Sequence, residues 1–346
     1  MKTEIITVKD DFTPLEKAAQ IIRKGGLVVF PTETVYGLGA NALNAEACKN
    51  IYAAKGRPSD NPLIIHISDT GELEKYTKIN TSPDSALMKR LAESFMPGPV
   101  TMILPKADII PSQVTAGLDT VAVRFPSHPV ARKLIELSGV PIAAPSANLS
   151  GSPSPTTAQH VINDLDGRVD MIIDGGACDL GLESTIIMPK DGRIKLLRPG
   201  AVTLEQLSEF APVDADKALT QKLASSEKPL APGMKYRHYA PRASVGIVSG
   251  ENDAVCDFFN ARLKEEKTAV LCFEEQKERL CTDKNVFSLG HRGDDIEQGR
   301  LLFVRLREID KTDCERAYAC EPSRSGVGFA VYNRLIKACG FEVIKL

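Results

Sequence analysis

The sequence predicts an α/β protein of two domains. Short runs of apolar and β-branched residues alternate with helical patterns, and this alternation is typical of α/β folds. The chain has 346 residues, which is too long for one ordinary domain and fits two. An acidic, alanine-rich piece and then a proline-rich basic stretch interrupt the alternation between residues 209 and 242. We therefore expect domains over 1–208 and 243–346, joined by a linker over 209–242.

Helices and strands of the first domain follow from apolar spacing and from glycine and proline stops. Helices are expected at 14–24, 45–55, 84–95 and 128–138. Buried strands are expected in the apolar runs at 27–31, 62–68, 100–104, 120–125, 140–145, 170–173, 184–188 and 193–198. After residue 243, four strand-like runs alternate with helical stretches, which predicts a smaller, Rossmann-like parallel sheet.

Composition and charge exclude several classes of function. The 43 basic and 45 acidic side chains give a net charge of -2, so the whole chain has no electrostatic pull toward nucleic acid or membranes. No apolar stretch approaches the roughly 20 residues of a membrane helix, and no secretory signal is visible. The eight cysteines are scattered without a C-x-x-C pair, which favours reduced, buried thiols. We expect a cytoplasmic protein whose basic chemistry is confined to a pocket.

Familiar nucleotide and metal motifs are missing. The chain has no G-x-x-x-x-G-K-[ST], no H-E-x-x-H and no G-x-S-x-G, which argues against a P-loop enzyme, a zincin and an α/β-hydrolase. Gly37-Leu38-Gly39 lacks the third glycine of a dinucleotide fingerprint. No set of protein side chains predicts a metal site.

Polar side chains lie on or just after the expected strands. Residues two apart share a face of a strand, so Thr32 and Thr34 extend the face of Val28 and Phe30 if that strand runs on. The other polar residues at strand positions or strand ends are His66, Arg124, Ser146, Asn148, Ser184 and Arg198. Because ligands bind at strand ends in α/β sheets, these side chains predict a shared pocket.

A pair of cations follows the second helix. Lys55 continues the inward-facing stripe of that helix and Arg57 lies just past its end, so both can reach one phosphate chain. Each residue has an ordinary alternative: a solvated helix end for this pair, a core position for His66, a structural ion pair for Arg124, and a turn for the Ser-Ala-Asn run. Taken together, cations and hydroxyls on one sheet favour a site for an anion and a nucleotide.

The basic part of the linker allows two interpretations. Residues 228–243 hold three prolines among basic and aromatic residues, including Tyr236 and His238. A proline-stiffened connector is one interpretation. The other is a loop that folds back over the site as a lid.

Motifs over most of the chain resemble those of the YrdC family. They are PTETVYGLGANA, KGRPSDNPLIIHI, PGPVTMIL, VAVRFP, PIAAPSANLSG and LESTII, followed by PGMKYRHYAP in the linker. With the Rossmann-like second domain, the resemblance is to the two-domain threonylcarbamoyl-AMP synthases. It is strongest over residues 25–200, where no departure from the family pattern is seen, and it is weak after about residue 245. It implies an open, twisted α/β domain around a basic concave cavity.

The resemblance also implies a reaction and its partners. Such an enzyme joins L-threonine, bicarbonate and ATP, with Mg²⁺, into threonylcarbamoyl-adenylate and releases pyrophosphate. Downstream tRNA threonylcarbamoyl-transferase proteins then modify an adenosine next to the anticodon. The chain itself would contact tRNA only weakly or indirectly.

Site residues are carried over by motif position. The threonine-binding set implied is Thr32, Thr34, His66, Arg124, Ala144 and Ser184. The ATP-binding set implied is Lys55, Arg57, Asn61, Thr120, Ser146, Asn148, Ser154, Arg198, Tyr236 and His238. Lys55 and Arg57 would also neutralise charge during the transfer and so act as the catalytic pair.

Three other functions compete with the synthase. An RNA-binding module could use the same basic cavity, although the near-neutral charge and the lack of an aromatic–basic stacking surface count against it. A carbamoyl-adenylate enzyme of hydrogenase maturation would carry cysteine-rich zinc modules, which this chain lacks. A regulatory protein that holds threonine and ATP without reaction has no positive support in the sequence.

Overall fold

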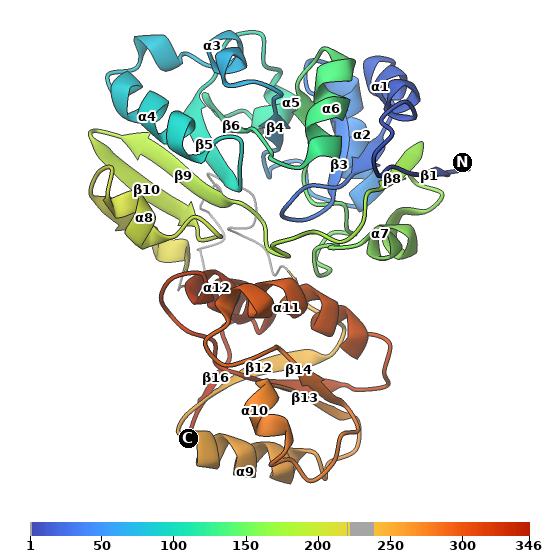
Figure 1. Cartoon of the computed structure of the whole chain (residues 1–346), viewed down its shortest axis with the longest axis vertical. Helices are drawn as coiled ribbons and strands as arrows, with labels where there is room; N and C mark the ends of the chain where they lie inside the picture. Colours follow the sequence, from blue (N-terminus) through green and yellow to red (C-terminus); the bar gives the residue numbers. More distant parts are fainter. Residues whose placement is uncertain (1, 220, 222–238) are drawn as a thin grey trace.

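The protein consists of two bodies, each built on its own sheet (Figure 1). The computed structural model describes residues 2–219, 221 and 239–346. The N-terminal body contains an 11-stranded mixed sheet, and the C-terminal body contains a 5-stranded sheet. This arrangement confirms the expected α/β class with a second, smaller sheet.

The large sheet has the order β1-β8-β2-β3-β7-β4-β6-β5-β9-β10-β11. Its strands are β1 (Glu4–Thr7), β2 (Val28–Phe30), β3 (Gly37–Asn41), β4 (Ile64–His66), β5 (Val100–Pro105), β6 (Thr120–Arg124), β7 (Ile142–Ala143), β8 (Met171–Asp174), β9 (Thr185–Lys190), β10 (Arg193–Arg198) and β11 (Val213–Ala215). The helices around it are α1 (Leu15–Arg23), α2 (Ala45–Lys55), α3 (Leu73–Tyr76), α4 (Ser85–Phe95), α5 (Ser112–Thr115), α6 (Pro129–Ser138), α7 (Ala158–Leu165) and α8 (Leu204–Ser208).

Helix α2 shows how local sequence sets the boundaries of an element next to the site. The Asn44 side chain accepts hydrogen bonds from the amides of Glu46 and Ala47, which caps the first turn. Gly56 ends the helix in the left-handed conformation at φ 61°, which costs a glycine little. The helix therefore occupies the expected residues and carries Lys55 in its last turn.

The chain after β2 differs from expectation. The strand ends at Phe30, and Thr32 closes a turn in which its hydroxyl donates to the carbonyl of Val35 at 2.7 Å. Thr32 and Thr34 approach each other, with 2.8 Å between their Oγ1 atoms, because of this turn and not because the strand continues. The unexpected strand β3 follows, and its Gly39 is required because a Cβ there would lie 2.8 Å from the Phe30 ring.

The first residues of the expected linker belong to the large sheet. Strand β11 pairs in parallel with β10, and the short helix η3 (Lys217–Leu219) follows it. Tyr236 and His238 lie outside the described residues, so their role as a lid stays a prediction.

The C-terminal body is a parallel sheet with helices on both faces. Its strand order is β14-β13-β15-β12-β16, and every pairing is parallel. The strands are β12 (Ser244–Ser249), β13 (Thr268–Cys272), β14 (Val286–Ser288), β15 (Arg316–Cys320) and β16 (Val343–Lys345), and the helices are α9 (Asn252–Arg262), α10 (Glu274–Lys277), α11 (Asp295–Ile309) and α12 (Gly328–Ala338). Helices α11 and α12 face the N-terminal body, whereas α9 and α10 cover the other face (Figure 1).

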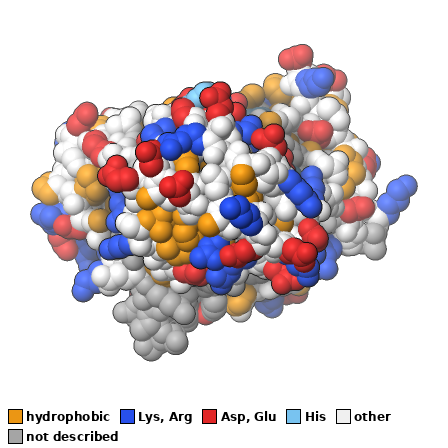
Figure 2. Space-filling view, turned by 90° about the horizontal axis from the view of Figure 1, so that it is seen from below, with side chains coloured by type: hydrophobic (Ala, Val, Ile, Leu, Met, Phe, Trp, Pro, Cys, Tyr) orange, Lys and Arg blue, Asp and Glu red, His pale blue; other side chains and the backbone are white. Residues whose placement is uncertain are grey.

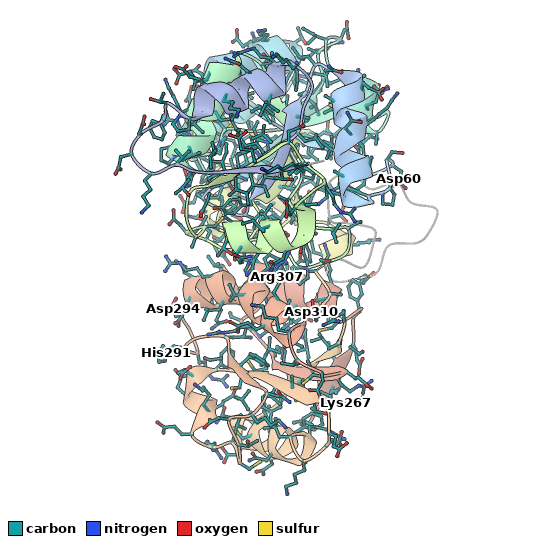
Figure 3. All side chains as sticks on the ribbon, turned by 90° about the vertical axis from the view of Figure 1, so that its right-hand side faces the viewer. Asp60, Lys267, His291, Asp294, Arg307 and Asp310 are labelled. Atoms are coloured by element: carbon teal, nitrogen blue, oxygen red, sulfur yellow. The ribbon has the colours of Figure 1, made fainter. Side chains whose placement is uncertain are left out.

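Arginines of α11 and α12 join the two bodies. Arg307 of α11 lies at the junction (Figure 3), forms an ion pair with Asp164 at 2.7 Å and donates to the carbonyl of Pro153 at 2.5 Å. Arg334 of α12 is fully buried and forms an ion pair with Glu183. Buried arginines need partners of this kind because an unpaired charge is costly to bury.

The face of the molecule that Figure 2 shows carries mixed charge. In the view of Figure 2, lysines and arginines alternate with aspartates and glutamates around an apolar patch. Within the described part of the chain, no helix is both long and apolar enough to span a bilayer.

Candidate functional site

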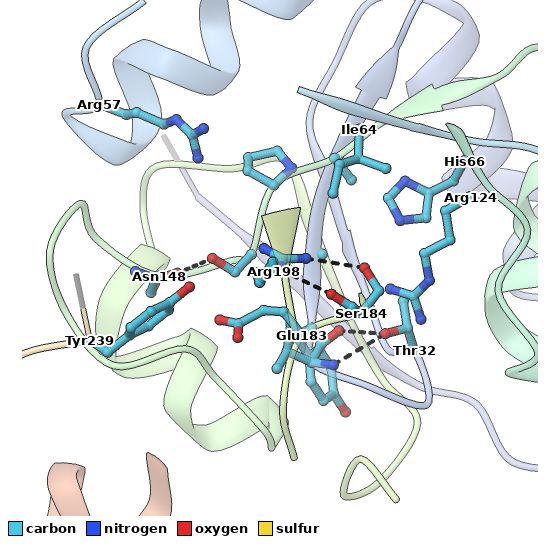
Figure 4. A pocket seen from close by; sticks show the side chains of 16 residues that line it. Thr32, Arg57, Ile64, His66, Arg124, Asn148, Glu183, Ser184, Arg198 and Tyr239 are labelled. Atoms are coloured by element: carbon cyan, nitrogen blue, oxygen red, sulfur yellow. Dashed lines mark hydrogen bonds between the residues drawn. The ribbon is translucent and has the colours of Figure 1, made fainter. Parts of the chain in front are cut away.

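One pocket of the N-terminal body gathers polar side chains from the turn after β2, from strand ends and from the loop after β7 (Figure 4). Its lining comprises Thr32, Val35, Tyr36, Gly37, Arg57, Ile64, His66, Arg124, Ala144, Pro145, Ser146, Asn148, Glu183, Ser184, Arg198 and Tyr239. His66 and Arg124 lie toward one end, and Arg57 lies toward the other (Figure 4).

Most of the residues singled out in the sequence meet at this pocket. Those that line it are Thr32, Arg57, His66, Arg124, Ala144, Ser146, Asn148, Ser184 and Arg198. Those that lie outside the lining are Thr34, Lys55, Asn61, Thr120 and Ser154. Thr34, Lys55 and Ser154 nevertheless bond residues of the lining directly, so they support its wall.

Arg124 organises the end of the pocket nearest the turn after β2. Its guanidinium pairs with the Glu33 carboxylate, with 2.7 Å between Nη2 and Oε1, and donates from Nη1 to Thr34 Oγ1 at 2.8 Å. Burial raises the pKa of Glu33, but the charge of Arg124 outweighs it and holds the pKa below its usual value. Glu33 is therefore a carboxylate at neutral pH, and its ion pair holds Arg124 in the wall.

His66 is a neutral imidazole in the same end of the pocket. Burial, with a contribution from Arg124, lowers its pKa to about 3. Its Nδ1 lies 3.3 Å from the carbonyl oxygen of Ile142. A carbonyl can only accept, so Nδ1 carries the proton and Nε2 is left as an acceptor. The site thus combines a fixed cation with a neutral hydrogen-bond acceptor.

Ser184 and Arg198 form the middle of the wall. Arg198 donates from Nε to the carbonyl of Ser184 at 2.9 Å and from Nη2 to Ser184 Oγ at 3.1 Å. The Ser184 hydroxyl also lies 2.7 Å from Thr101 Oγ1. Burial lowers the pKa of Arg198 to about 10, so the group stays a cation at neutral pH. Its charge is held at a fixed position, as the stabilisation of a transferring phosphoryl group requires.

Lys55 and Arg57, which were expected to act as a pair, have different surroundings in the structure. Arg57 lines the pocket and donates from Nη2 to the carbonyl of Pro62 at 3.2 Å. Lys55 points behind the wall, where Nζ donates to the carbonyls of Ser146 and Asn148, each at 2.5 Å. Burial lowers the Lys55 pKa well below its usual value. Lys55 therefore fixes the Ser-Ala-Asn loop from beneath in this structure.

Glu183 and Tyr239 are among the lining residues that the sequence analysis did not single out. Glu183 accepts from Ser154 Oγ and from Arg334, and Tyr239 packs on Phe303 of α11 with 5.2 Å between ring centroids. The motif LESTII contained Glu183, but its partner lies 151 residues away in the other body. The residue pattern of one strand could not predict the ion pair between Glu183 and Arg334.

The described residues of the pocket include no ligand set for a metal ion. Among residues 2–219, 221 and 239–346, no group of three or more histidine, cysteine, aspartate or glutamate side chains could hold one. The carboxylates of Glu33 and Glu183 both face arginines. These residues do not fit a protein-bound Mg²⁺.

Comparisons with known proteins agree over the whole length. The Sua5/YciO/YrdC family model, described as telomere recombination, matches residues 20–200, and a model described as the threonylcarbamoyl-AMP synthase C-terminal domain matches residues 202–340. Proteins named threonylcarbamoyl-AMP synthase are 44% identical in Bacillus subtilis, over 100% of both chains, and 47% identical in Pyrococcus abyssi, over 95% of both.

A solved structure extends the likeness to three dimensions. The crystal structure of P. abyssi Sua5 complexed with L-threonine superimposes with a TM-score of 0.91 at 46% identity, over 99% of this chain and 100% of that one. Escherichia coli YciO, at 27% identity and a TM-score of 0.50, covers 57% of this chain. The chain therefore belongs to the Sua5/YciO/YrdC family, with the C-terminal domain of the threonylcarbamoyl-AMP synthases.

Proposed function

We propose that the pocket is the active site of an L-threonylcarbamoyladenylate synthase, a nucleotidyltransferase that makes threonylcarbamoyl-AMP and pyrophosphate from L-threonine, bicarbonate and ATP. The observation that carries the proposal is the arrangement of Arg124 and Arg57 toward opposite ends of one pocket. One cation suits a small carboxylate and the other a phosphate chain. Two proteins with the named activity, over 40% identical across their lengths, support it.

Threonine would occupy the end that holds Arg124. The guanidinium is already oriented by Glu33, so it can pair with the substrate carboxylate without reorganisation. Neutral His66 offers an acceptor for the ammonium or hydroxyl group, and Thr32, Ala144 and Ser184 complete this end. Of the expected threonine set, Thr34 acts through Arg124, to which its hydroxyl is bonded.

ATP would extend toward Arg57 and the Ser-Ala-Asn loop. Arg57 and Arg198 are the cations that line the route, with Ser146 and Asn148 beside them. Lys55, Asn61 and Ser154 lie outside the lining but bond Asn148, Arg57 and Glu183, so we assign them to supporting the pocket. Thr120 also lies outside the lining, and its place in the ATP set stays a prediction. Tyr236 and His238 would close over the nucleotide as a lid.

The chemistry needs positioning and charge neutralisation. The threonine amine and bicarbonate give a carbamate and water, and a carbamate oxygen then attacks the α-phosphorus while pyrophosphate leaves. Such transfers depend on preorganised cations and need no covalent nucleophile. A lid that excludes water protects the labile carbamate. We expect Mg²⁺ to arrive bound to the triphosphate, because the pocket carboxylates face arginines.

The product would be used outside this chain. We propose that tRNA threonylcarbamoyl-transferase proteins in the cytoplasm consume threonylcarbamoyl-AMP, with tRNA contacting this chain weakly or indirectly. The net charge of -2 is consistent with weak contact.

The deciding experiment is pyrophosphate release from ATP by the purified chain, with and without L-threonine and bicarbonate. We expect release that depends on both, together with a threonine-bearing adenylate in the mass spectrum. Pyrophosphate release without such an adenylate would contradict the proposed substrates. No release under any of these conditions would leave a binding protein, and RNA would be the next ligand to test.

A further inference from the structure

A second cavity lies in the C-terminal body, at the carboxyl ends of its parallel strands. We call it the C-terminal cavity. Its volume is about 660 Å³, within the range of about 300–1,000 Å³ that is usual for small-molecule sites. Its lining comprises Val248, Ser249, Gly250, Glu251, Val255, Phe273, Gln276, Arg292, Gly293, Asp295, Gln298, Cys320, Glu321, Pro322, Ser323, Arg324 and Leu346. It shares no lining residue with the pocket of the N-terminal body.

The topology explains why a cavity forms there. Strands β12 and β15 are parallel neighbours. The chain leaves β12 for α9 on one face of the sheet and leaves β15 for α12 on the opposite face (Figure 1). Connections that diverge from adjacent strands open a crevice outside their carboxyl ends, and open α/β sheets bind ligands at this point. The cavity lining includes the residues that follow both strands, Ser249–Glu251 and Cys320–Arg324.

Two side chains in the lining have oxygen atoms without a partner among the described residues. Gln298 is only 1% exposed; its amide nitrogen donates to the carbonyl of His291 at 2.8 Å, but Oε1 accepts nothing. Asp295 Oδ2 accepts from the Gly328 amide at 3.0 Å, whereas Oδ1 accepts nothing. Buried acceptors without donors are rare and costly. A ligand that presents hydroxyl or amino donors would satisfy both.

The charges in the lining disfavour an anionic ligand. Glu321 and Arg324 neutralise each other in an ion pair at 2.5 Å. The remaining charges are Glu251, Asp295 and Arg292, so the carboxylates are in excess by one. Glu251 is the N-cap residue of α9, so its negative charge lies near the helix N-terminus, where a phosphate would otherwise be favoured. The ligand is therefore expected to be neutral and rich in donors.

One edge of the cavity offers a surface on which a flat part of a ligand could stack. The Arg292 guanidinium lies over the Phe273 ring, with 4.6 Å from Cζ to the ring centroid. Phe273 is buried and Arg292 is exposed, so the ring supports the guanidinium from below. Guanidinium planes stack on aromatic groups, including nucleobases.

From these observations we infer that the C-terminal cavity binds a neutral nucleoside, with its base stacked on Arg292 and its ribose hydroxyls donating to Asp295 and Gln298. Carboxylates at strand ends recognise ribose hydroxyls in other doubly wound sheets. The excess carboxylate charge would repel a 5′-phosphate. We therefore expect the cavity to prefer a nucleoside over the corresponding nucleotide, whereas an ATP site prefers the nucleotide. This site is separate from the proposed active site and does not depend on its assignment.

Methyl NMR of the full chain, with adenosine and AMP as probes, tests the inference. Val255 and Leu346 report on the C-terminal cavity, and Val35 and Ile64 report on the other pocket. Adenosine is expected to shift the Val255 and Leu346 signals to saturation, and AMP is expected to do so at least ~10-fold more weakly. No saturable shift at millimolar adenosine, or tighter binding of AMP in this cavity, would overturn the proposal.

Two variants tie the signal to the cavity. Arg292→Ala removes the platform and should weaken adenosine binding at least ~10-fold, whereas Arg279→Ala, outside the lining, should change it less than ~2-fold. Ser323→Trp should block the cavity, and Ser325→Trp, two residues on and also exposed, is its matched control. Threonine-dependent pyrophosphate release should persist in all four variants, so loss of nucleoside binding is distinguishable from failure of the proposed synthase. Unchanged binding in Arg292→Ala and Ser323→Trp would exclude this site.

Discussion

Arg334 of the C-terminal body forms a buried ion pair with Glu183 in the wall of the N-terminal pocket, with 2.9 Å between Nε and Oε2. The same guanidinium donates to the carbonyls of Glu183 and Pro199 at 3.1 and 2.7 Å. Glu183 in turn accepts from Ser154, next to the Ser-Ala-Asn loop. Burial raises the Glu183 pKa, but Arg334 and Arg198 outweigh it and hold the pKa below its usual value. A helix of the second body thus fixes the wall of the first.

Replacing Arg334 by methionine is expected to reduce both stability and turnover. Removing one partner of a buried pair costs about 3–5 kcal/mol, because the other charge stays buried without compensation. Urea unfolding should show this loss, and the kcat of pyrophosphate release should fall because Glu183 no longer holds its place. Arg334→Lys, which keeps the charge but not the fork, should recover part of the kcat.

Two further variants control this experiment. Glu183→Gln combined with Arg334→Met should recover part of the stability, because neither member of the pair then stays buried as a charge without the other. Recovery should be incomplete, because Arg198 loses the neighbouring Glu183 carboxylate. Arg279→Met removes an exposed pair with Asp253 and should change the unfolding free energy by less than about 1 kcal/mol. Wild-type stability and kcat in Arg334→Met would show that the contact is incidental.

Lys55 and Arg57 should give different phenotypes. Arg57→Ala removes a cation of the pocket and should lower adenylate formation at least ~100-fold, the effect of losing one preorganised donor, with little change in unfolding free energy. Lys55→Ala should lower the rate to a similar extent and also cost about 1–3 kcal/mol of stability, because two carbonyls of the loop lose their donor. Lys49→Ala, exposed on the same helix, is the control. Near-normal rates in both variants would contradict the assignment of this end to ATP.

Local pattern predicted much of the fold and most of the pocket. Helix α2 was predicted from its apolar spacing and from the glycine that ends it, and both signals lie within residues 45–56. His66 and Arg124 come together because β4 and β6 pair in register, and both strands were predicted from their apolar runs. Strand polarity therefore predicted that the two side chains share a pocket, whereas their assignment to threonine came from the family resemblance and stays a prediction.

Contacts between distant segments could not be predicted in the same way. Strand β3 is rich in glycine because the Phe30 ring lies against it, and this reason is visible only after folding. Lys55 matches a phosphate-binding cation in the sequence, yet its ammonium reaches the loop 91 residues later. The role of Glu183 likewise depends on Arg334. Long-range packing, which leaves no periodic signal, determines all three.

Arg124 should determine the affinity for threonine. Arg124→Gln alone would leave the Glu33 carboxylate facing the substrate carboxylate, so the informative variant combines Glu33→Gln with Arg124→Gln. A charged hydrogen bond contributes about 1.5–3 kcal/mol, so the threonine KM should rise about 10- to 150-fold while the ATP KM changes little. Arg132→Gln, outside the pocket lining, should leave both unchanged. An unaltered threonine KM in the double variant would mean that the threonine carboxylate does not bind at Arg124.

The neutral state of His66 predicts a specific dependence of stability on pH. Its pKa is lowered to about 3 in the folded chain, chiefly by burial, whereas an unfolded histidine titrates near 6.5. Between these values the unfolded chain binds the extra proton, so this group makes stability fall as pH decreases from 6.5 toward 3, by up to about 1.4 kcal/mol per pH unit. His66→Gln should remove this part of the slope. His291→Gln is a control with the opposite effect on stability. The hydrogen bond to Glu275 raises the His291 pKa, so this histidine stabilises the folded chain at low pH and its contribution is lost as pH rises.

The check is urea unfolding at several pH values with NMR of the His66 ring protons, which should not titrate between pH 8 and 5. A titration near 6.5 would mean that the ring is charged at mildly acidic pH and that the pocket binds threonine through a different set of hydrogen bonds.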